Sequence, residues 1–307
     1  MVIDMSDYNQ LKGKIEELKS ELNAIIVAHN YQRPEVQDIA DFVGDSLELS
    51  QRCTQVDAET IVFCGVRFMA ETAAILNPER TVLLSEGNAG CPLADCITID
   101  KLTEWKQRYP QASVVSYINS SAEIKAESYT CCTSANSVKI VESVPNNDIL
   151  FVPDQNLGHY VATQTTKNII LYPGFCYVHN RIKPEQVKLA RELHPDVKLI
   201  VHPECQPEVT ELADVVLSTS QMLRYVQASP DKSFIIGTEE GLLHRLHLDN
   251  PDKTFYLVSN DQICINMKRT TLEILAQTME FKQNIVTVPE SIRIKAKEAV
   301  DRMLSVT

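Results

Sequence analysis

AIIVAHNY, residues 24–31, is an apolar run that ends in polar residues, and this pattern occurs twice more in the chain. Its counterparts are SVVSYINS (113–120) and KLIVHPEC (198–205). A short apolar run bounded by polar residues is typical of a buried β-strand. Three such runs at wide spacing indicate an internal repeat, which must be recognised before other features of the fold.

Three more segments recur in the same order after each opening strand. Hydroxyl-rich turns that begin a helical pattern come first, at VGDSLELS (43–50), CTSANSVK (132–139) and LSTSQMLR (217–224). Second strand-like runs follow at TIVFCGV (60–66), DILFVPD (148–154) and SFIIGTE (233–239). Each unit then closes on a cysteine, in TVLLSEGNAGC (81–91), NIILYPGFC (168–176) and TFYLVSNDQIC (254–264). The order strand, helix, strand, helix, strand indicates a small parallel sheet covered by helices.

The sequence therefore predicts an α/β fold of three repeated three-layer α/β/α units, with small parallel sheets arranged around a pseudo-threefold axis. The predicted units are 1–100 with an N-terminal helix, 101–182, and 183–307 with a C-terminal helix. Further helices are expected at 8–22, 103–110, 184–193 and 289–304. Because no flexible linker rich in Gly, Ser or Pro separates the units, we expect one compact body.

Composition and charge restrict the possible partners. A hydrophobic content of 44% with 23% charged residues is ordinary for a globular chain. The net charge of −12 argues against nucleic acid or an anionic membrane, although a locally positive pocket for an acidic small molecule stays open. The N-terminus lacks a signal-peptide pattern, and no apolar run approaches the ~18 residues of a membrane span, so we expect a cytoplasmic protein. Nine cysteines in a reducing compartment disfavour a disulfide framework.

Equivalent positions in the three units carry chemistry-bearing residues. The opening strands end at His29, Tyr117 and His202, and the residues two positions later are Tyr31, Asn119 and Glu204. The hydroxyl residues at one shared offset of 17 (46 − 29, 134 − 117 and 219 − 202) are Ser46, Ser134 and Thr219. The closing cysteines are Cys91, Cys176 and Cys264. Since ligands collect at the carboxyl ends of parallel strands, we expect these groups to meet at one site.

Three convergent cysteines have three possible explanations. They can hold three irons of a [4Fe–4S] cluster, leaving a fourth iron open as a Lewis acid. They can also form a zinc site or be buried packing residues, which free cysteines often are. Cys53 and Cys64 lie in helical and strand patterns and are expected to be packing residues. No role is expected for the cysteines without a repeat counterpart, Cys96, Cys131, Cys132 and Cys205.

The polar residues have structural explanations too. Ser46, Ser134 and Thr219 stand where helix N-caps are expected, but three hydroxyls at one offset also suggest a polyanionic ligand. The histidines, tyrosines, Asn119 and Glu204 can be satisfied polar groups, or can transfer protons if they cluster near a metal. His179, three residues after Cys176, is a fourth ligand, a surface histidine or, as we favour, a residue that contacts the substrate or supports a ligand.

Several motifs together resemble the quinolinate synthase family over nearly the whole chain: AHNYQRPEVQDIADFVGDSLELS, GVRFMAETAAILNPE, YINSSAEIKA, TSANSV, GFCYVH, VHPECQPEV and LSTSQM. The resemblance implies three α/β units around a central cluster. It also implies an enzyme of NAD biosynthesis that condenses iminoaspartate with dihydroxyacetone phosphate to quinolinate, releasing phosphate and water in a transferase- or lyase-type reaction. Coupling to an iminoaspartate-producing enzyme is expected.

Carried over to this sequence, the resemblance implies Cys91, Cys176 and Cys264 as ligands of a [4Fe–4S] cluster. It implies Tyr31 and Glu204 as an acid–base pair, with His29 and His202 orienting the ligand. The implied substrate contacts are His29, Ser46, Tyr117, Asn119, Ser134, His202, Glu204 and Thr219, to which we add His179. Some members carry a CxxCxxC group near the C-terminus, where this chain has only Cys264. A cluster-dependent hydro-lyase on a hydroxy-acid and a non-enzymatic iron–sulfur sensor are the alternatives.

Overall fold

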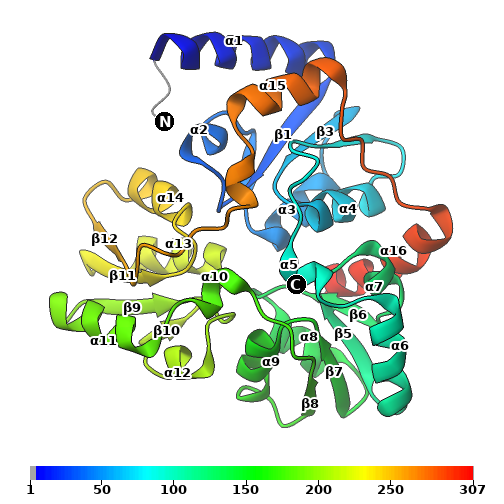
Figure 1. Ribbon diagram of the computed structural model, residues 1–307, viewed down its shortest axis with the longest axis vertical. Coiled ribbons are helices and arrows are strands. Elements are labelled where there is room, and N and C mark those ends of the chain that lie inside the picture. Colours follow the sequence, from blue (N-terminus) through cyan, green and yellow to red (C-terminus); the bar gives the residue numbers. More distant parts are fainter. Residues whose placement is uncertain (1–4, 307) are drawn as a thin grey trace.

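A computed structural model describes residues 5–306 of the chain. Residues 1–4 and 307, the outer ends of the predicted first and third units, lie outside the described residues. The described part contains three separate four-stranded sheets, and all strand pairs in them are parallel. Figure 1 shows the three units placed around the middle of the molecule. The predicted α/β fold of three repeated units is confirmed.

The elements follow one another in the same order in each unit. The first unit contains α1 (Met5–Glu21), β1 (Ala24–His29), α2 (Pro34–Gln37), β2 (Phe42–Gly44), α3 (Ser46–Cys53), β3 (Thr60–Cys64), α4 (Arg67–Leu76), β4 (Thr81–Leu84) and α5 (Pro92–Asp95). The second contains α6 (Ile99–Arg108), β5 (Ser113–Tyr117), α7 (Ala122–Ala126), β6 (Thr130–Cys132), α8 (Ser137–Ser143), β7 (Asp148–Val152), α9 (Gln155–Ala162), β8 (Asn168–Leu171) and α10 (Tyr177–Asn180).

The third unit contains α11 (Pro184–Leu193), β9 (Lys198–Val201), α12 (Pro207–Thr210), β10 (Val215–Val216), α13 (Thr219–Ala228), β11 (Ser233–Gly237), α14 (Leu242–Asp249) and β12 (Thr254–Leu257). The 3₁₀ turn η1 (Met267–Arg269) and the helices α15 (Leu272–Phe281) and α16 (Glu290–Ser305) complete the described chain. The helices expected at 8–22, 103–110, 184–193 and 289–304 correspond to α1, α6, α11 and α16. None of the described helices is long and apolar enough to cross a membrane.

The number of strands per unit differs from the prediction. Each sheet has a fourth strand, β2, β6 or β10, at the edge beside the opening strand, which gives the orders β2-β1-β3-β4, β6-β5-β7-β8 and β10-β9-β11-β12. These edge strands have only three, three and two residues. A strand of this length is too short to show a pattern of alternation, so the sequence could not reveal it.

The hydrophobic cores join the units unequally. One continuous core runs from the first sheet through the second and includes Ala299, Val300 and Met303 of α16. The third sheet has its own cores on its two faces. Helix α15 packs on α1, and α16 packs on α7 and β6, so the C-terminal helices cover the first two units (Figure 1). The unit boundaries at 100 and 182 stay predictions.

Candidate active site

A cavity lies where the three units meet, and the strand-end loops of all three line it. Its lining contains all thirteen residues that the sequence singles out: His29, Tyr31, Ser46, Cys91, Tyr117, Asn119, Ser134, Cys176, His179, His202, Glu204, Thr219 and Cys264. None of the other six cysteines lines it. The lining residues also include no lysine or arginine, so the positive pocket that the net charge left open is not formed by the described side chains. An anion would have to be held here by neutral donors.

Two histidines adopt the same local arrangement at equivalent strand ends. Nδ1 of His29 accepts a hydrogen bond from the backbone N–H of Tyr31 (3.1 Å), and Nδ1 of His202 accepts one from the N–H of Glu204 (3.3 Å). Burial lowers the pKa of both histidines to about 3, so both rings are neutral at pH 7. Because Nδ1 is an acceptor, the single ring proton lies on Nε2. Each histidine is therefore an N–H donor for a ligand.

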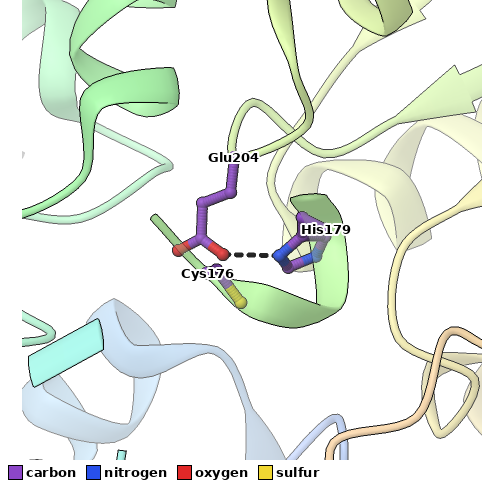
Figure 2. A group of neighbouring side chains, drawn as sticks. All are labelled: Cys176, His179 and Glu204. Carbon is purple, nitrogen blue, oxygen red and sulfur yellow. Dashed lines mark ion pairs between the residues drawn. The ribbon is translucent and has the colours of Figure 1, made fainter. Parts of the chain in front are cut away.

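Glu204 is one of the buried carboxyl groups that line the cavity, with 3% of its surface exposed. Figure 2 shows its side chain facing His179, with Oε2 2.6 Å from Nδ1, and beside Cys176. Burial acts to raise the pKa of Glu204, but its interactions with His179 outweigh this effect and lower the pKa to about 2. Oε1 has no hydrogen-bond partner among the described residues. This buried, unpaired oxygen is free to accept a bond from a ligand.

A chain of polar contacts connects Tyr31 to Glu204. The hydroxyl of Tyr31 lies 2.6 Å from Oγ1 of Thr238, which lies 2.9 Å from Nε2 of His179. His179 then faces Glu204 through Nδ1. His179 is 1% exposed, so the surface explanation is wrong. Its Nε2 lies beside Thr238 and its Nδ1 beside Glu204, so the ring supports the carboxylate, and its role as a metal ligand stays untested.

Thr238 completes this chain of contacts, but its sequence position gives no sign of a functional role. It follows β11 directly and is fully buried. The equivalent positions in the other two units are Pro153 and Gly65, which carry no hydroxyl. No repeat signal could therefore identify it, and only the packing of the first unit against the third brings it to Tyr31.

The tyrosine and the asparagine of the second unit lie on the same cavity. Burial raises the pKa of Tyr117 well above its usual value, and the nearby charge of Glu204 adds to this effect. The phenol is therefore protonated at neutral pH and can donate a hydrogen bond. Oδ1 of Asn119 is buried without a partner in the described part of the chain. Asn119 is thus available to a bound molecule, whereas the phenol of Tyr117 also interacts with Glu204.

The expected capping role of the three hydroxyls is wrong. Asp45 and Ser218 are the N-caps of α3 and α13, and both form capping boxes, so Ser46 and Thr219 are the first residues inside these helices. Ser134 lies two positions before Asn136, which stands at the start of α8. Asp45 and Ser218 make the cap bonds of α3 and α13, and α8 has no side-chain cap bond, so none of the three hydroxyls caps a helix. Thr219 accepts one bond, from the side chain of Asn30 at 3.0 Å.

The three closing cysteines occupy similar local positions. Cys91 and Cys176 stand directly before the short helices α5 and α10, and the N–H of Lys268 in η1 bonds to the carbonyl of Cys264. All three are partly exposed. Burial raises the pKa of each thiol, and the neighbouring cysteines raise that of Cys91 and Cys176 further. The three thiols can act as ligands of a cation, because its positive charge would offset the repulsion between their thiolate forms and its binding would displace their protons.

The spacing of the three cysteines argues against a single zinc ion bound by all of them. Zinc binds thiolates at about 2.3 Å, which brings its ligand sulfurs within about 4 Å of one another. Among residues 5–306, the group whose ligand atoms all lie within 4.8 Å is Cys176, His179 and Glu204, and the three cysteines do not form such a tight set. Thiolates of an iron–sulfur cluster each bind a different iron and lie farther apart. The three cysteines are therefore too far apart to bind one zinc ion together as placed, and the cluster stays a prediction.

Comparisons with known proteins show the family of the chain. A family model described as "Quinolinate synthetase A protein" matches residues 13–305. A quinolinate synthase of Thermodesulfovibrio yellowstonii is 57% identical over 298 residues, 97% of this chain and 98% of that protein. One of Dehalococcoides mccartyi is 56% identical over 297 residues, with the same coverage, and quinolinate synthase 1 of Methanosarcina acetivorans is 54% identical over 293 residues, 95% of this chain and 96% of that protein. The chain belongs to the quinolinate synthase family of enzymes.

Proposed function

We propose that this enzyme condenses iminoaspartate with dihydroxyacetone phosphate to quinolinate, releasing phosphate and water, as a step of NAD biosynthesis. The observation that carries the proposal is the cavity, which combines three cysteines with two neutral histidines and the ionised, partly unpaired Glu204. Membership of the quinolinate synthase family supports the same reaction. We place the protein in the cytoplasm, as the sequence predicts.

Cys91, Cys176 and Cys264 would hold a [4Fe–4S] cluster, with one iron left without a protein ligand. When bound, such a cluster supplies a Lewis acid that lowers the cost of expelling hydroxide from a carbon atom. The three cysteines come from three different units, so the site forms only when all units are folded together.

Neutral donors bind the carboxylates and the phosphate of the substrates in this proposal. His29 and His202 contribute Nε2–H groups, and Tyr117 contributes its phenol. Ser46, Ser134 and Thr219 contribute hydroxyls at the entrance of helical turns, where the backbone also favours anions. Because the lining has no lysine or arginine, these neutral donors and the backbone at the helix starts would have to bind the anionic groups.

Tyr31 and Glu204 manage the protons of isomerisation and dehydration. Glu204 is a carboxylate at neutral pH and has a free oxygen toward the cavity, so it can accept a proton. Burial raises the pKa of Tyr31 well above its usual value, which keeps its phenol protonated and able to donate. Thr238 and His179 connect the two groups, so a proton taken up at one end can be returned to the other.

The test is quinolinate formation by anaerobically purified enzyme given both substrates. We expect product that requires iminoaspartate and dihydroxyacetone phosphate together. An enzyme with full iron and sulfide content that forms no quinolinate, but dehydrates a hydroxy-acid, would show the alternative hydro-lyase instead. No turnover of either kind, with an intact cluster, would support the sensor hypothesis.

Iminoaspartate is an imine, and imines hydrolyse readily in water. We therefore propose that the enzyme works beside another that produces iminoaspartate. Mixing the two enzymes should then give more quinolinate than supplying the imine at the same rate from solution, and an equal yield would contradict the coupling.

A further inference from the structure

Two fully buried carboxylates, Asp154 and Glu239, lie at equivalent places behind two of the cysteines. Each comes 37 positions after the end of the opening strand of its unit (154 − 117 and 239 − 202). Asp154 follows β7 and Glu239 follows β11, the same strand of the second and third sheets. Burying a carboxyl group costs free energy unless it is well bonded, so two at matched positions require an explanation.

Each carboxylate binds the backbone of a closing cysteine. Oδ2 of Asp154 accepts a hydrogen bond from the N–H of Cys176 (3.1 Å), and Oε1 of Glu239 accepts one from the N–H of Cys264 (2.9 Å). The second oxygen of each holds the following turn: Asp154 caps α9 through the N–H of Leu157 (2.8 Å), and Glu239 accepts the N–H of Gly241 (2.7 Å). Each side chain thus links the end of a central strand to the cysteine of its unit.

The first unit provides a natural comparison, because its equivalent residue is the apolar, buried Val66 (66 − 29 is again 37). All three units nevertheless close the cysteine loop with the same backbone bond, from the residue after this position to the residue two before the cysteine. These bonds are Arg67 N to Ala89 O (2.8 Å), Gln155 N to Gly174 O (2.7 Å) and Glu240 N to Gln262 O (2.9 Å). The loop therefore forms without a carboxylate, and Asp154 and Glu239 serve a purpose beyond its shape.

Hydrogen bonds to the sulfurs and the nearby charge set the reduction potential of an iron–sulfur cluster. A backbone N–H that bonds to a sulfur makes reduction easier, whereas Asp154 and Glu239 keep the N–H groups of Cys176 and Cys264 occupied. Glu239 is also paired with Lys268, whose Nζ lies 3.1 Å away, as expected for a charged carboxylate. The charge of Glu239, held beside Lys268, opposes the addition of an electron to a nearby cluster.

We propose that Asp154 and Glu239 are positioning residues that fix two of the three cluster thiolates and keep the reduction potential of the cluster low. A cluster that is hard to reduce remains in one oxidation state inside a reducing cell and can act as a Lewis acid without exchanging electrons. The inference rests on the proposed cluster, and it concerns the protein groups behind the ligands.

The test uses Asp154→Ser and Glu239→Gln in the full chain, purified and handled without oxygen. Serine is a good N-cap, so Asp154→Ser keeps the cap of α9 but cannot bind the N–H of Cys176 as well. Thr271→Ala, which removes the cap of α15 away from the cavity, is the control for loss of a helix cap alone. The measurements are iron and sulfide content, the thermal unfolding midpoint, and the cluster midpoint potential from a redox titration followed by electron paramagnetic resonance.

We expect the potential to shift upward in both variants and to stay unchanged in Thr271→Ala. Loss of iron from a variant whose metal-free form unfolds at the same midpoint as the metal-free wild type would equally support the positioning role. Full iron content with the potential of the wild type in both variants would overturn the proposal. If Asp154→Ser does not fold, Glu239→Gln decides. A wild-type chain that binds no iron would instead refute the cluster itself, so the two failures can be told apart.

Discussion

At the scale of single residues, the cavity depends on which polar atoms already have partners. Backbone N–H groups occupy Nδ1 of His29 and His202 and so direct the proton of each ring to Nε2. His179 occupies one oxygen of Glu204 and leaves the other unpaired. The local bonds thus prepare two donors and one acceptor for a ligand before it binds.

Replacing Glu204 with glutamine should remove the proton acceptor while keeping the size of the side chain. We expect turnover to fall by at least about 100-fold, the usual contribution of a general acid or base, while the iron content stays that of the wild type. Quinolinate formation and iron analysis on the same preparation check this. Glu208→Gln, at an exposed position close in sequence, is the matched control. Unchanged activity in Glu204→Gln would contradict its catalytic role.

Thr238→Val should remove the hydroxyl that bridges Tyr31 and His179 and leave only their longer direct contact of 3.4 Å, without changing the volume of the side chain much. Loss of one buried hydrogen bond of ~1.4 kcal/mol corresponds to about a tenfold lower kcat. Thr238→Ser retains the hydroxyl and should restore most of the rate. Steady-state kinetics of both variants are the measurement, and equal rates for valine and serine would show that the hydroxyl is not needed.

Acid should destabilise the metal-free chain through its buried histidines. The pKa of His29 and His202 is lowered from 6.5 to about 3. Between these pH values, the two histidines are therefore protonated in the unfolded chain and neutral in the folded chain. Stability is therefore lost as pH falls from about 6.5 toward 3, by up to about 1.4 kcal/mol per pH unit for each histidine. Denaturant unfolding of His202→Asn across this range should show a shallower slope than the wild type. The exposed His247→Asn variant should keep the original slope.

At the scale of elements, the same structural pattern occurs in each unit around the site. A strand ends, a loop carries polar groups, and a helical turn begins at or soon after a cysteine. The C-terminal helix α16 has a different task. Its buried face packs on α7 and β6 and continues the core shared by the first two units. This helix holds together the units that carry Cys91 and Cys176.

Met303→Ala should reveal the contribution of α16. Met303 is fully buried, and truncation of a buried methionine costs about 2–5 kcal/mol because it leaves a cavity. Ile294→Ala on the same helix, where 49% of the side chain is exposed, should cost far less. Chemical denaturation of the two variants gives both free energies of unfolding, and equal values would contradict the packing role.

At the scale of the whole molecule, three units of one architecture present different side chains to one point. Strand-end groups from all three line the cavity, and the chain's net charge of −12 is accompanied by a lining without lysine or arginine. Because each unit contributes one cysteine, the site depends on the assembly of the three units. Folding and metal binding should therefore be coupled.

Cysteine-to-alanine variants at each of the nine positions test this convergence. We expect loss of iron and sulfide at Cys91, Cys176 and Cys264 only. Cys96→Ala is the sharpest control, since Cys96 lies five positions from Cys91 but does not line the cavity. Iron loss at Cys96, or iron retained at any of the three closing cysteines, would contradict the proposed ligand set.

The sequence by itself determined the repeat, the parallel sheets and the set of residues around the cavity. It could do so because hydrophobic periodicity and equal offsets between repeats can be recognised in the order of residues alone. It did not show the edge strands β2, β6 and β10, which are too short for any periodicity. It also misplaced the caps of α3 and α13 by one position, since both Asp45 and Ser46 are acceptable caps and only the backbone decides between them.

The tertiary structure alone decided which atoms face each other across units. Tyr31, Thr238 and His179 are brought together from three units, and Thr238 has no counterpart at the equivalent positions. The carboxylates Asp154 and Glu239 share an offset, yet their bonds to Cys176 and Cys264 appear only once the loops are folded. Hydrogen bonds require positions within a few tenths of an ångström, and packing between units supplies this accuracy, whereas spacing along the chain does not.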